Sequence, residues 1–163
     1  MARALIVGCG CRGRGLGREL LERGWQVRGT TRQESVLEGI EQAGIEAAIA
    51  DPDRPGTILD RCGDVTVVVW LLGSAAGEPE LVAAVHGPRL ERLLEKLVDS
   101  PVRGFVYETA GTGSGEVLQG GREIVERAAA TWRIPVAFLD FEPSAEDWTQ
   151  RAGDATAGVI AGR

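Results

Sequence analysis

The feature that most constrains this chain is a short glycine-rich segment that follows an apolar run near its start. Three glycines lie there at the spacing G-x-G-x-x-G, as Gly8, Gly10 and Gly13. The first would permit a tight turn out of a strand, the second would let a phosphate approach the backbone, and the third would let a following helix pack against the sheet. The N–H groups and the dipole of the first helical turn favour an anion. The segment, with Cys11 and Arg12 inside it, therefore predicts a binding site for the pyrophosphate of a dinucleotide.

The motif alone is a weak signal, because glycine accounts for 23 of the 163 residues. Its context strengthens it. A buried strand over residues 4–7 precedes the glycines, a helical pattern runs to Gly24, and a second strand follows over residues 26–30. This is the βαβ order that the motif requires. The dinucleotide interpretation is favoured, and the alternative is a tight turn between strand and helix that binds nothing.

Helical and extended patterns alternate along the whole chain, without a low-complexity segment or a further repeat. The alternation predicts one α/β domain over residues 1–163, with a three-layer, doubly wound (Rossmann) fold and a mostly parallel sheet of about six strands. The fourth extended segment is apolar nearly throughout, as expected of a central strand covered on both faces, so Trp70 is expected in the core. The predicted strands lie at about 3–8, 26–31, 45–50, 65–72, 103–109 and 134–140, and the predicted helices at about 13–23, 33–43, 55–62, 78–99, 116–132 and 144–160.

The end of the second predicted strand bears on the choice between NAD and NADP. It reads Gly29, Thr30, Thr31, Arg32, and no Asp or Glu occurs between positions 26 and 33. An acidic residue here would bind the ribose 2′-hydroxyl of NAD, whereas hydroxyls and an arginine can surround a 2′-phosphate. The sequence therefore favours NADP(H). Alternatively, Arg32 is an ordinary charged residue at the start of a helix.

Residues after the third and fourth strands are further candidates, because ligands of open α/β sheets bind beyond the carboxyl ends of the strands. Asp51 could accept a hydrogen bond from an adenine amino group or could simply be a turn residue before proline. Leu72, Gly73 and Ser74 would run past the ribose and phosphates of the cofactor. Gly73 would permit close approach there, or would only form a turn.

Composition excludes several other classes of function. A formal net charge of −6 and the lack of a basic block argue against a nucleic-acid partner. The chain has no apolar run long enough to span a membrane and no secretory signal pattern, so a cytoplasmic protein is expected. Cys9 and Cys11 form a C-x-C pair, but Cys62 and His86 are the only further cysteine and histidine. No metal site is predicted, the cysteines are expected as free thiols, and His86 is expected on the surface or in packing.

The chain resembles the short-chain dehydrogenase/reductase superfamily, in particular its atypical and extended NAD(P)-binding members related to sugar epimerases. The matching segments are residues 6–13, residues 29–32, Asp51, residues 68–73 and residues 104–109. The resemblance spans about residues 3–143 and implies a Rossmann fold with a nicotinamide dinucleotide cofactor. It also implies a Tyr-x-x-x-Lys pair in the helix after the fifth strand, which exchanges a proton with the substrate.

That catalytic pair has no counterpart in this sequence. The only tyrosine, Tyr107, and the only lysine, Lys96, cannot occupy the two positions, which align with Leu118 and Arg122. Arg122 could still hold the nicotinamide ribose, but a group so basic cannot serve as an acid at neutral pH. Thr109 and Thr112 follow the fifth strand, near the residue that polarises a substrate oxygen in the family, or are turn hydroxyls.

Three functions remain open from the sequence. The favoured one is a stand-alone NADP(H)-binding domain, able to accept NAD as well, that acts as a sensor, a regulator or a subunit without Tyr/Lys catalysis. The alternative is a small reductase that passes hydride from NADPH directly to a planar acceptor such as a flavin or quinone. A cofactor-free interaction module is the third possibility. The segment after the sixth strand, residues 144–163, is too short for a substrate domain, which favours a homodimer or a larger protein partner.

Overall fold

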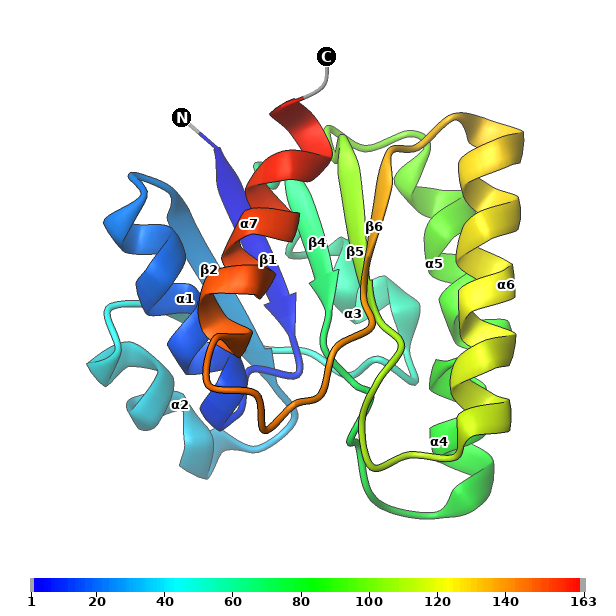
Figure 1. Ribbon diagram of the computed structural model, residues 1–163, viewed down its shortest axis with the longest axis horizontal. Coiled ribbons are helices and arrows are strands. Elements are labelled where there is room, and N and C mark those ends of the chain that lie inside the picture. Colours follow the sequence, from blue (N-terminus) through cyan, green and yellow to red (C-terminus); the bar gives the residue numbers. More distant parts are fainter. Residues whose placement is uncertain (1, 162–163) are drawn as a thin grey trace.

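The computed structural model describes residues 2–161 and has one six-stranded sheet with helices on both faces (Figure 1). The sheet is entirely parallel, in the order β3-β2-β1-β4-β5-β6. The predicted doubly wound fold is therefore confirmed. Its strands are β1 (Arg3–Val7), β2 (Gln26–Thr31), β3 (Glu46–Ile49), β4 (Val67–Trp70), β5 (Gly104–Glu108) and β6 (Val136–Leu139).

The two central strands of the sheet, β1 and β4, are almost completely buried. All four residues of β4 and the last four of β1 are buried, as expected when helices cover both faces of a sheet. β1 pairs with β2 on one side and β4 on the other, so that Ile6 lies opposite Gly29 and Val69. The strand order reverses at this point, and the carboxyl ends of β1 and β4 diverge there into their loops.

The helices divide between the two faces according to the direction of each crossover (Figure 1). One face carries α1 (Cys11–Glu22), α2 (Glu34–Gln42) and α7 (Trp148–Ala161), and α1 packs directly against α7. The other face carries α3 (Pro55–Leu59), α4 (Pro79–Val85), α5 (Pro88–Leu97) and α6 (Gly115–Trp132).

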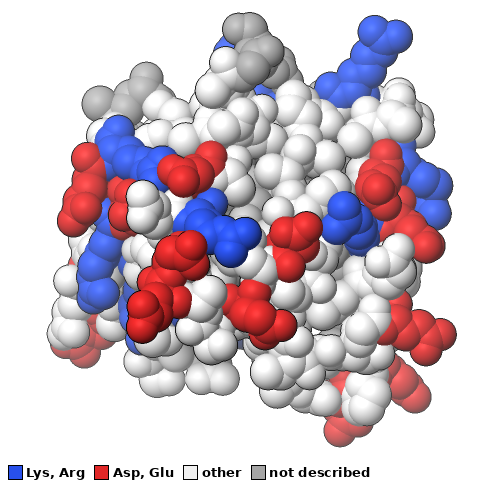
Figure 2. Space-filling model, in the orientation of Figure 1, with Lys and Arg blue, Asp and Glu red and all other residues white. Residues whose placement is uncertain are grey.

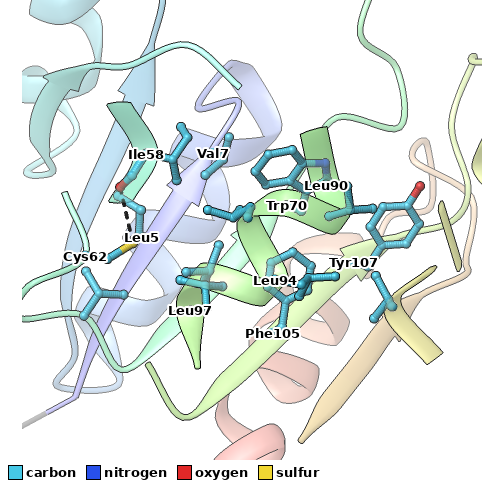
Figure 3. Packing of buried hydrophobic residues seen from close by; sticks show 14 of the residues in the cluster. Leu5, Val7, Ile58, Cys62, Trp70, Leu90, Leu94, Leu97, Phe105 and Tyr107 are labelled. Atoms are coloured by element: carbon cyan, nitrogen blue, oxygen red, sulfur yellow. Dashed lines mark hydrogen bonds between the residues drawn. The ribbon is translucent and has the colours of Figure 1, made fainter. Parts of the chain in front are cut away.

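A separate apolar core fills the space between the sheet and each helical layer. On the face of α5, Trp70 and Phe105 contact each other with ring centroids 6.2 Å apart, beside Leu90 and Leu94 of the helix (Figure 3). Trp70 is fully buried, as predicted, and its indole N–H donates to the carbonyl of Val85 at 3.2 Å. This bond satisfies a polar group that burial would otherwise leave without a partner.

The prediction of one long helix over residues 78–99 is wrong, because the structure has two helices there, α4 and α5. Gly87 between them has φ −129° and ψ −113°, which is outside the helical region. Pro88 has no N–H and disfavours helical backbone in the residue before it. The break allows His86, at the end of α4, to be buried with 2% of its surface exposed. The last helix also begins later than predicted, at Trp148, after turns over residues 142–147.

Charged side chains of both signs lie on the face of the molecule seen in the orientation of Figure 1. Figure 2 shows acidic and basic side chains interspersed over the face that it presents. Among the described residues, no helix combines the length and the apolar character needed to cross a membrane.

Candidate functional site

A cleft of about 430 Å³ opens at the carboxyl ends of β1, β2, β3 and β4. Its walls come from the loop after each of these strands and from the first turns of α1 and α2. Within the described part of the chain, the lining contains no carboxylate, imidazole, amine or phenol. The lining residues are Gly8, Cys9, Gly10, Cys11, Arg12, Gly13, Thr30, Thr31, Arg32, Gln33, Val36, Ala50, Pro52, Leu71, Leu72, Ser74, Ala75 and Ala76.

The glycine-rich segment forms the floor of the cleft. Gly8 adopts φ +86°, and a Cβ there would lie 2.6 Å from the carbonyl oxygen of Leu71, so only glycine fits this turn. Gly10 is the N-cap of α1, without a side chain to accept from the helix, and the first turn of α1 contains no acidic residue. The first N–H groups of the helix have no intrahelical acceptors and are directed toward the cleft end of the helix. An anion bound there would satisfy them and interact favourably with the helix dipole.

The end of β2 supplies the polar wall of the cleft. Thr30 is buried and Thr31 half-buried, and the hydroxyl oxygen of Thr31 accepts from the backbone N–H of Gln33 at 3.2 Å. Arg32 is exposed, and no ion-pair partner for it is found among the described residues. Arg28 on the same strand differs, because Glu46 and Asp64 bind its guanidinium. Arg32 is thus a cation at the cleft that no described carboxylate of the protein neutralises.

Asp51 and Gly73 are the two predicted cofactor-binding residues that do not line the cleft, whereas the other ten do. The carboxylate of Asp51 accepts from the backbone N–H of Asp53 at 2.9 Å, and its own N–H donates to the hydroxyl of Thr57 at 2.8 Å. These are the contacts of a turn residue. The N–H of Gly73 donates to Oε1 of Glu108 at 2.7 Å, beneath the loop after β4.

Arg12 lies in the glycine-rich segment, but its guanidinium turns away from the α1 turn toward the end of β5. Its Nη1 pairs with Oε2 of Glu108, and its Nη2 donates to Oε1 at 3.2 Å. The guanidinium also lies over the ring of Trp148, 4.8 Å from its centroid. The Glu108 side chain is only 1% exposed, so this fork-shaped pair compensates a buried charge.

Sequence reasoning did not select Glu108, although a signal was present. A carboxylate at the end of an otherwise apolar strand, GFVYE, is almost never buried without a partner. The partner could not be inferred, because Arg12 and Glu108 are 96 positions apart and only the strand order brings them together. Trp148, whose indole nitrogen is buried without a hydrogen-bond partner among the described protein atoms, completes this cluster.

The loops after β4 and β5 are joined to each other. The N–H of Gly113 donates to the carbonyl of Gly73 at 2.9 Å, and the N–H of Thr112 donates to the hydroxyl of Ser74 at 3.1 Å. A Cβ on Gly111 would lie 2.3 Å from the carbonyl oxygen of Gly73, so the two backbones are in direct contact. This part of the sheet edge is filled by the chain itself.

The three weak catalytic candidates lie outside the cleft. The Thr109 hydroxyl donates to the carbonyl of Leu139 at 3.3 Å, and Thr112 belongs to the joined loops just described. Arg122 on α6 lies over the ring of Phe138, 4.2 Å from its centroid, with Glu126 3.9 Å from its Nε. None of the three lines the cleft, and the structure does not bring them together.

His86 and Tyr107 form a buried polar pair that the sequence did not reveal. The His86 Nε2–H donates to the carbonyl of Leu72 at 2.9 Å, so Nδ1 accepts from the hydroxyl of Tyr107 at 2.7 Å. Burial lowers the pKa of His86 and raises that of Tyr107. The pair supports the loop after β4 from below and holds the only phenol of the chain away from the cleft.

The cysteines differ in exposure. All three are free; Cys9 and Cys62 are buried, and burial raises the pKa of each thiol to about 12. Cys11 is exposed at the start of α1 and lines the cleft. Across residues 2–161 no group of three or more His, Cys, Asp or Glu side chains is arranged to hold a metal ion.

No protein-family model matches the chain, and no curated protein matches it. Solved structures do. UDP-glucuronic acid 4-epimerase from Bacillus cereus in complex with NAD has a TM-score of 0.68 and 15% identity over 86% of this chain and 55% of its own. UDP-glucose 4-epimerase from Thermotoga maritima with UDP-glucose has a TM-score of 0.69 and 16% identity over 84% and 54%. Triphenylmethane reductase from Citrobacter sp. complexed with NADP(H) has a TM-score of 0.64 and 17% identity over 83% and 48%.

The chain thus spans about half the length of these proteins, and identities below one fifth establish likeness of fold alone. The fold expected from the resemblance is confirmed: the chain has the Rossmann-type fold seen in these two epimerases and this reductase.

Proposed function

We propose that this protein binds a nicotinamide dinucleotide in the cleft, prefers NADP(H) to NAD(H), and acts as a sensor, a regulator or a subunit without Tyr/Lys catalysis. One observation carries the proposal. The uncapped first turn of α1 lies on the same cleft as Arg32, which has no ion-pair partner among the described residues, and the described lining has no acidic side chain. The solved structures named above support it, since two of them were determined with NAD or NADP(H).

The pyrophosphate would lie at the first turn of α1. Its negative charge would accept from the N–H groups that no side chain caps, at a place where Gly10 has no Cβ. A Cβ at Gly10 would meet no atom within 4 Å, so the space above this residue is open. A phosphate can approach the backbone there without displacing any part of the protein.

The preference for NADP(H) rests on the end of β2. A 2′-phosphate between Thr31 and Arg32 would receive a charge-assisted hydrogen bond from a guanidinium that has no described ion-pair partner. NAD(H) has a hydroxyl at this place, and the lining offers it no carboxylate. The difference favours the phosphorylated cofactor.

The absence of Tyr/Lys catalysis rests on where the candidate proton donors lie. Tyr107 is fully buried and bound to His86, Lys96 lies exposed on α5, and Leu118 is buried. No phenol or amine of the described chain therefore reaches the cleft, where such a group would have to meet the substrate. A bound nicotinamide ring would supply hydride chemistry, but the side chains that line the cleft supply no matched acid.

Calorimetric titration with NADP⁺, NADPH and NAD⁺ tests the proposal. We expect micromolar affinity for the NADP forms, and about a tenfold or greater loss for NADP⁺ in Arg32→Ala, because a hydrogen bond to a charged group is lost. NAD⁺ affinity should be unchanged in this variant. Arg18→Ala is the matched control, since Arg18 is exposed on α1 and does not line the cleft. A well-folded protein that binds neither cofactor would refute the proposal.

Gly10→Asp separates loss of binding from loss of fold. Aspartate is a favourable N-cap residue, so the variant should be at least as stable as the wild type. Its carboxylate would take the N–H groups and repel the pyrophosphate, so we expect cofactor binding to be abolished. Gly10→Ala, which adds only a methyl group in open space, is the steric control.

Cys11 gives a second readout of the same site. The exposed Cys11 should react with a thiol reagent such as dithionitrobenzoate much faster than the buried Cys9 and Cys62. NADP⁺ should slow that reaction, because Cys11 lines the cleft. An unchanged labelling rate at saturating NADP⁺ would place the cofactor elsewhere.

The proposal includes a protein partner or a second copy of the chain, because a cofactor sensor acts by binding another protein molecule. Exposed apolar side chains on the far helical layer support it: Leu81 is 46% exposed, Val98 47% and Trp132 37%. Sedimentation with and without NADP⁺ would measure self-association directly. A monomer under both conditions would leave only a different protein as the partner.

A further inference from the structure

The cleft occupies only one half of the sheet's carboxyl edge. Its described lining comes from the loops after β1, β2, β3 and β4, and no residue after β5 or β6 contributes to it. A doubly wound sheet consists of two mononucleotide-binding halves, and a dinucleotide lies across the point where the strand order reverses. This protein therefore has an open half at β3-β2-β1, and the other half, at β4-β5-β6, is occupied by the protein's own residues.

Arg12 crosses into that other half. It starts in the glycine-rich segment after β1 and reaches Glu108 at the end of β5, with Trp148 of α7 against its guanidinium. Glu108 is 1% exposed, and both of its carboxylate oxygens have partners, since Oε1 also accepts from the N–H of Gly73. Both oxygens of the Glu108 carboxylate are therefore engaged within the protein, and the charge of Arg12 is compensated by Glu108.

The joined loops close the same half from the other side. Gly111 and Gly113 lie directly on the carbonyl of Gly73, and Ser74 binds the N–H of Thr112. A nucleotide could enter between β4 and β5 only if these backbone contacts separated. The cost would include the loss of two hydrogen bonds and the exposure of the Glu108 pair.

We propose that the site recognises the 2′-phosphoadenosine diphosphate part of NADP(H) and leaves the nicotinamide ring without a pocket. This inference rests on the proposed function and narrows its ligand class to adenine nucleotides with a 2′-phosphate and a pyrophosphate. The ring would extend past Ala75 and Ala76 at the rim of the cleft. A protein of this kind distinguishes NADP(H) from NAD(H) by the 2′-phosphate. It does not distinguish NADP⁺ from NADPH.

Two ligands that differ only in the ring test the inference. By calorimetry, 2′-phospho-ADP-ribose, which is NADP⁺ without nicotinamide, should bind within about threefold of NADP⁺, and NADPH should bind equally. Nicotinamide mononucleotide should not bind. Affinity for NADP⁺ more than tenfold above that for 2′-phospho-ADP-ribose would overturn the inference while leaving the proposed function intact. No binding of any of them by folded protein would instead overturn the proposed function itself.

A double variant tests the reason for closure. Arg12→Leu with Glu108→Gln removes the ion pair, and the glutamine oxygen still accepts from the N–H of Gly73. We expect NADP⁺ to gain at least fivefold over 2′-phospho-ADP-ribose, because without the ion pair the joined loops can separate at a lower cost and admit the ring. Arg127→Leu with Glu91→Gln, an Arg–Glu pair between α6 and α5, is the matched control. If the folded double variant shows the same ratio of NADP⁺ affinity to 2′-phospho-ADP-ribose affinity as the wild type, the Arg12 pair does not exclude the ring. If the double variant does not fold, the comparison of the two ligands with the wild-type protein decides.

Discussion

The two halves of the carboxyl edge are built from similar parallel strands, yet one is open and the other is closed. In the open half, the N-cap of α1 is Gly10, which has no side chain to cap the helix. In the closed half, the N-cap of α6 is Ser114, whose hydroxyl accepts from the N–H of Val117 at 3.5 Å. The comparison teaches that strand geometry creates two equivalent positions for a ligand, and that the first residues after each strand decide which position stays available.

The largest loss of stability should come from removing the Arg12–Glu108 ion pair in the closed half. Arg12→Ala leaves the Glu108 carboxylate buried without its cation, so we expect the free energy of unfolding to fall by about 3 kcal/mol. For a chain of this size that corresponds to a melting temperature about 6–12 °C lower. Chemical denaturation and calorimetric melting would measure it. Exposed Arg18→Ala should change neither, and a loss below about 1 kcal/mol in Arg12→Ala would mean that the pair behaves as a surface salt bridge.

A smaller loss is expected when the support beneath the closed half is overpacked. A Cβ at Gly121 of α6 would lie 1.9 Å from the hydroxyl oxygen of Tyr107 and 3.2 Å from the carbonyl oxygen of His86. Gly121→Ala should therefore cost about 2 kcal/mol, although alanine is the better helix former. Gly120→Ala is the matched control, because a Cβ there meets nothing within 4 Å. Equal stability of the two variants would contradict the packing described.

The smallest effect should be a dependence of stability on pH in the same half. Burial lowers the pKa of His86 below its ordinary 6.5, so the unfolded chain takes up this proton at a higher pH than the folded chain. The free energy of unfolding contributed by this group is therefore complete above about pH 6.5 and falls as the pH drops through the interval below it. Urea denaturation at a series of pH values measures the slope.

His86→Gln is the variant that isolates this contribution, because an amide can donate to Leu72 and accept from Tyr107 without titrating. The variant should show a flatter profile between pH 7 and pH 5 than the wild type. Asp64, whose pKa is lowered by its bond to Arg28, acts below its usual 3.8 and so lies outside this interval. A profile of the same slope in both proteins would show that His86 is not the group responsible.

Local sequence signals predicted the open half well. The glycine spacing and its strand and helix flanks depend on neighbours within about twenty positions, which is why the β1-α1-β2 unit was correctly anticipated. The residues at the end of β2 follow from the same unit, since a strand end and the next loop are adjacent in sequence. Ten of the twelve predicted cofactor-binding residues line one cleft for this reason.

The closed half depends on contacts between distant segments, which periodicity does not report. Arg12 was assigned to the ligand from its place in the glycine segment, but the direction of its side chain is set by Glu108, on a strand that only the sheet order brings near. The helix over 78–99 was predicted as continuous, although Gly87 and Pro88 inside it are a local signal for a break. The burial of His86 beside this break could not be predicted, because its partner Tyr107 is 21 positions away.

The ion pair between Arg12 and Glu108 also provides a way to sort related sequences. A lineage that replaces arginine at position 12 with an apolar residue would retain an uncompensated buried carboxylate unless position 108 also changed. Substitutions at the two positions should therefore occur together during evolution. Chains with the pair would form one group with a closed second half, and chains that have lost both charges would form a second group, in which that half need not be closed.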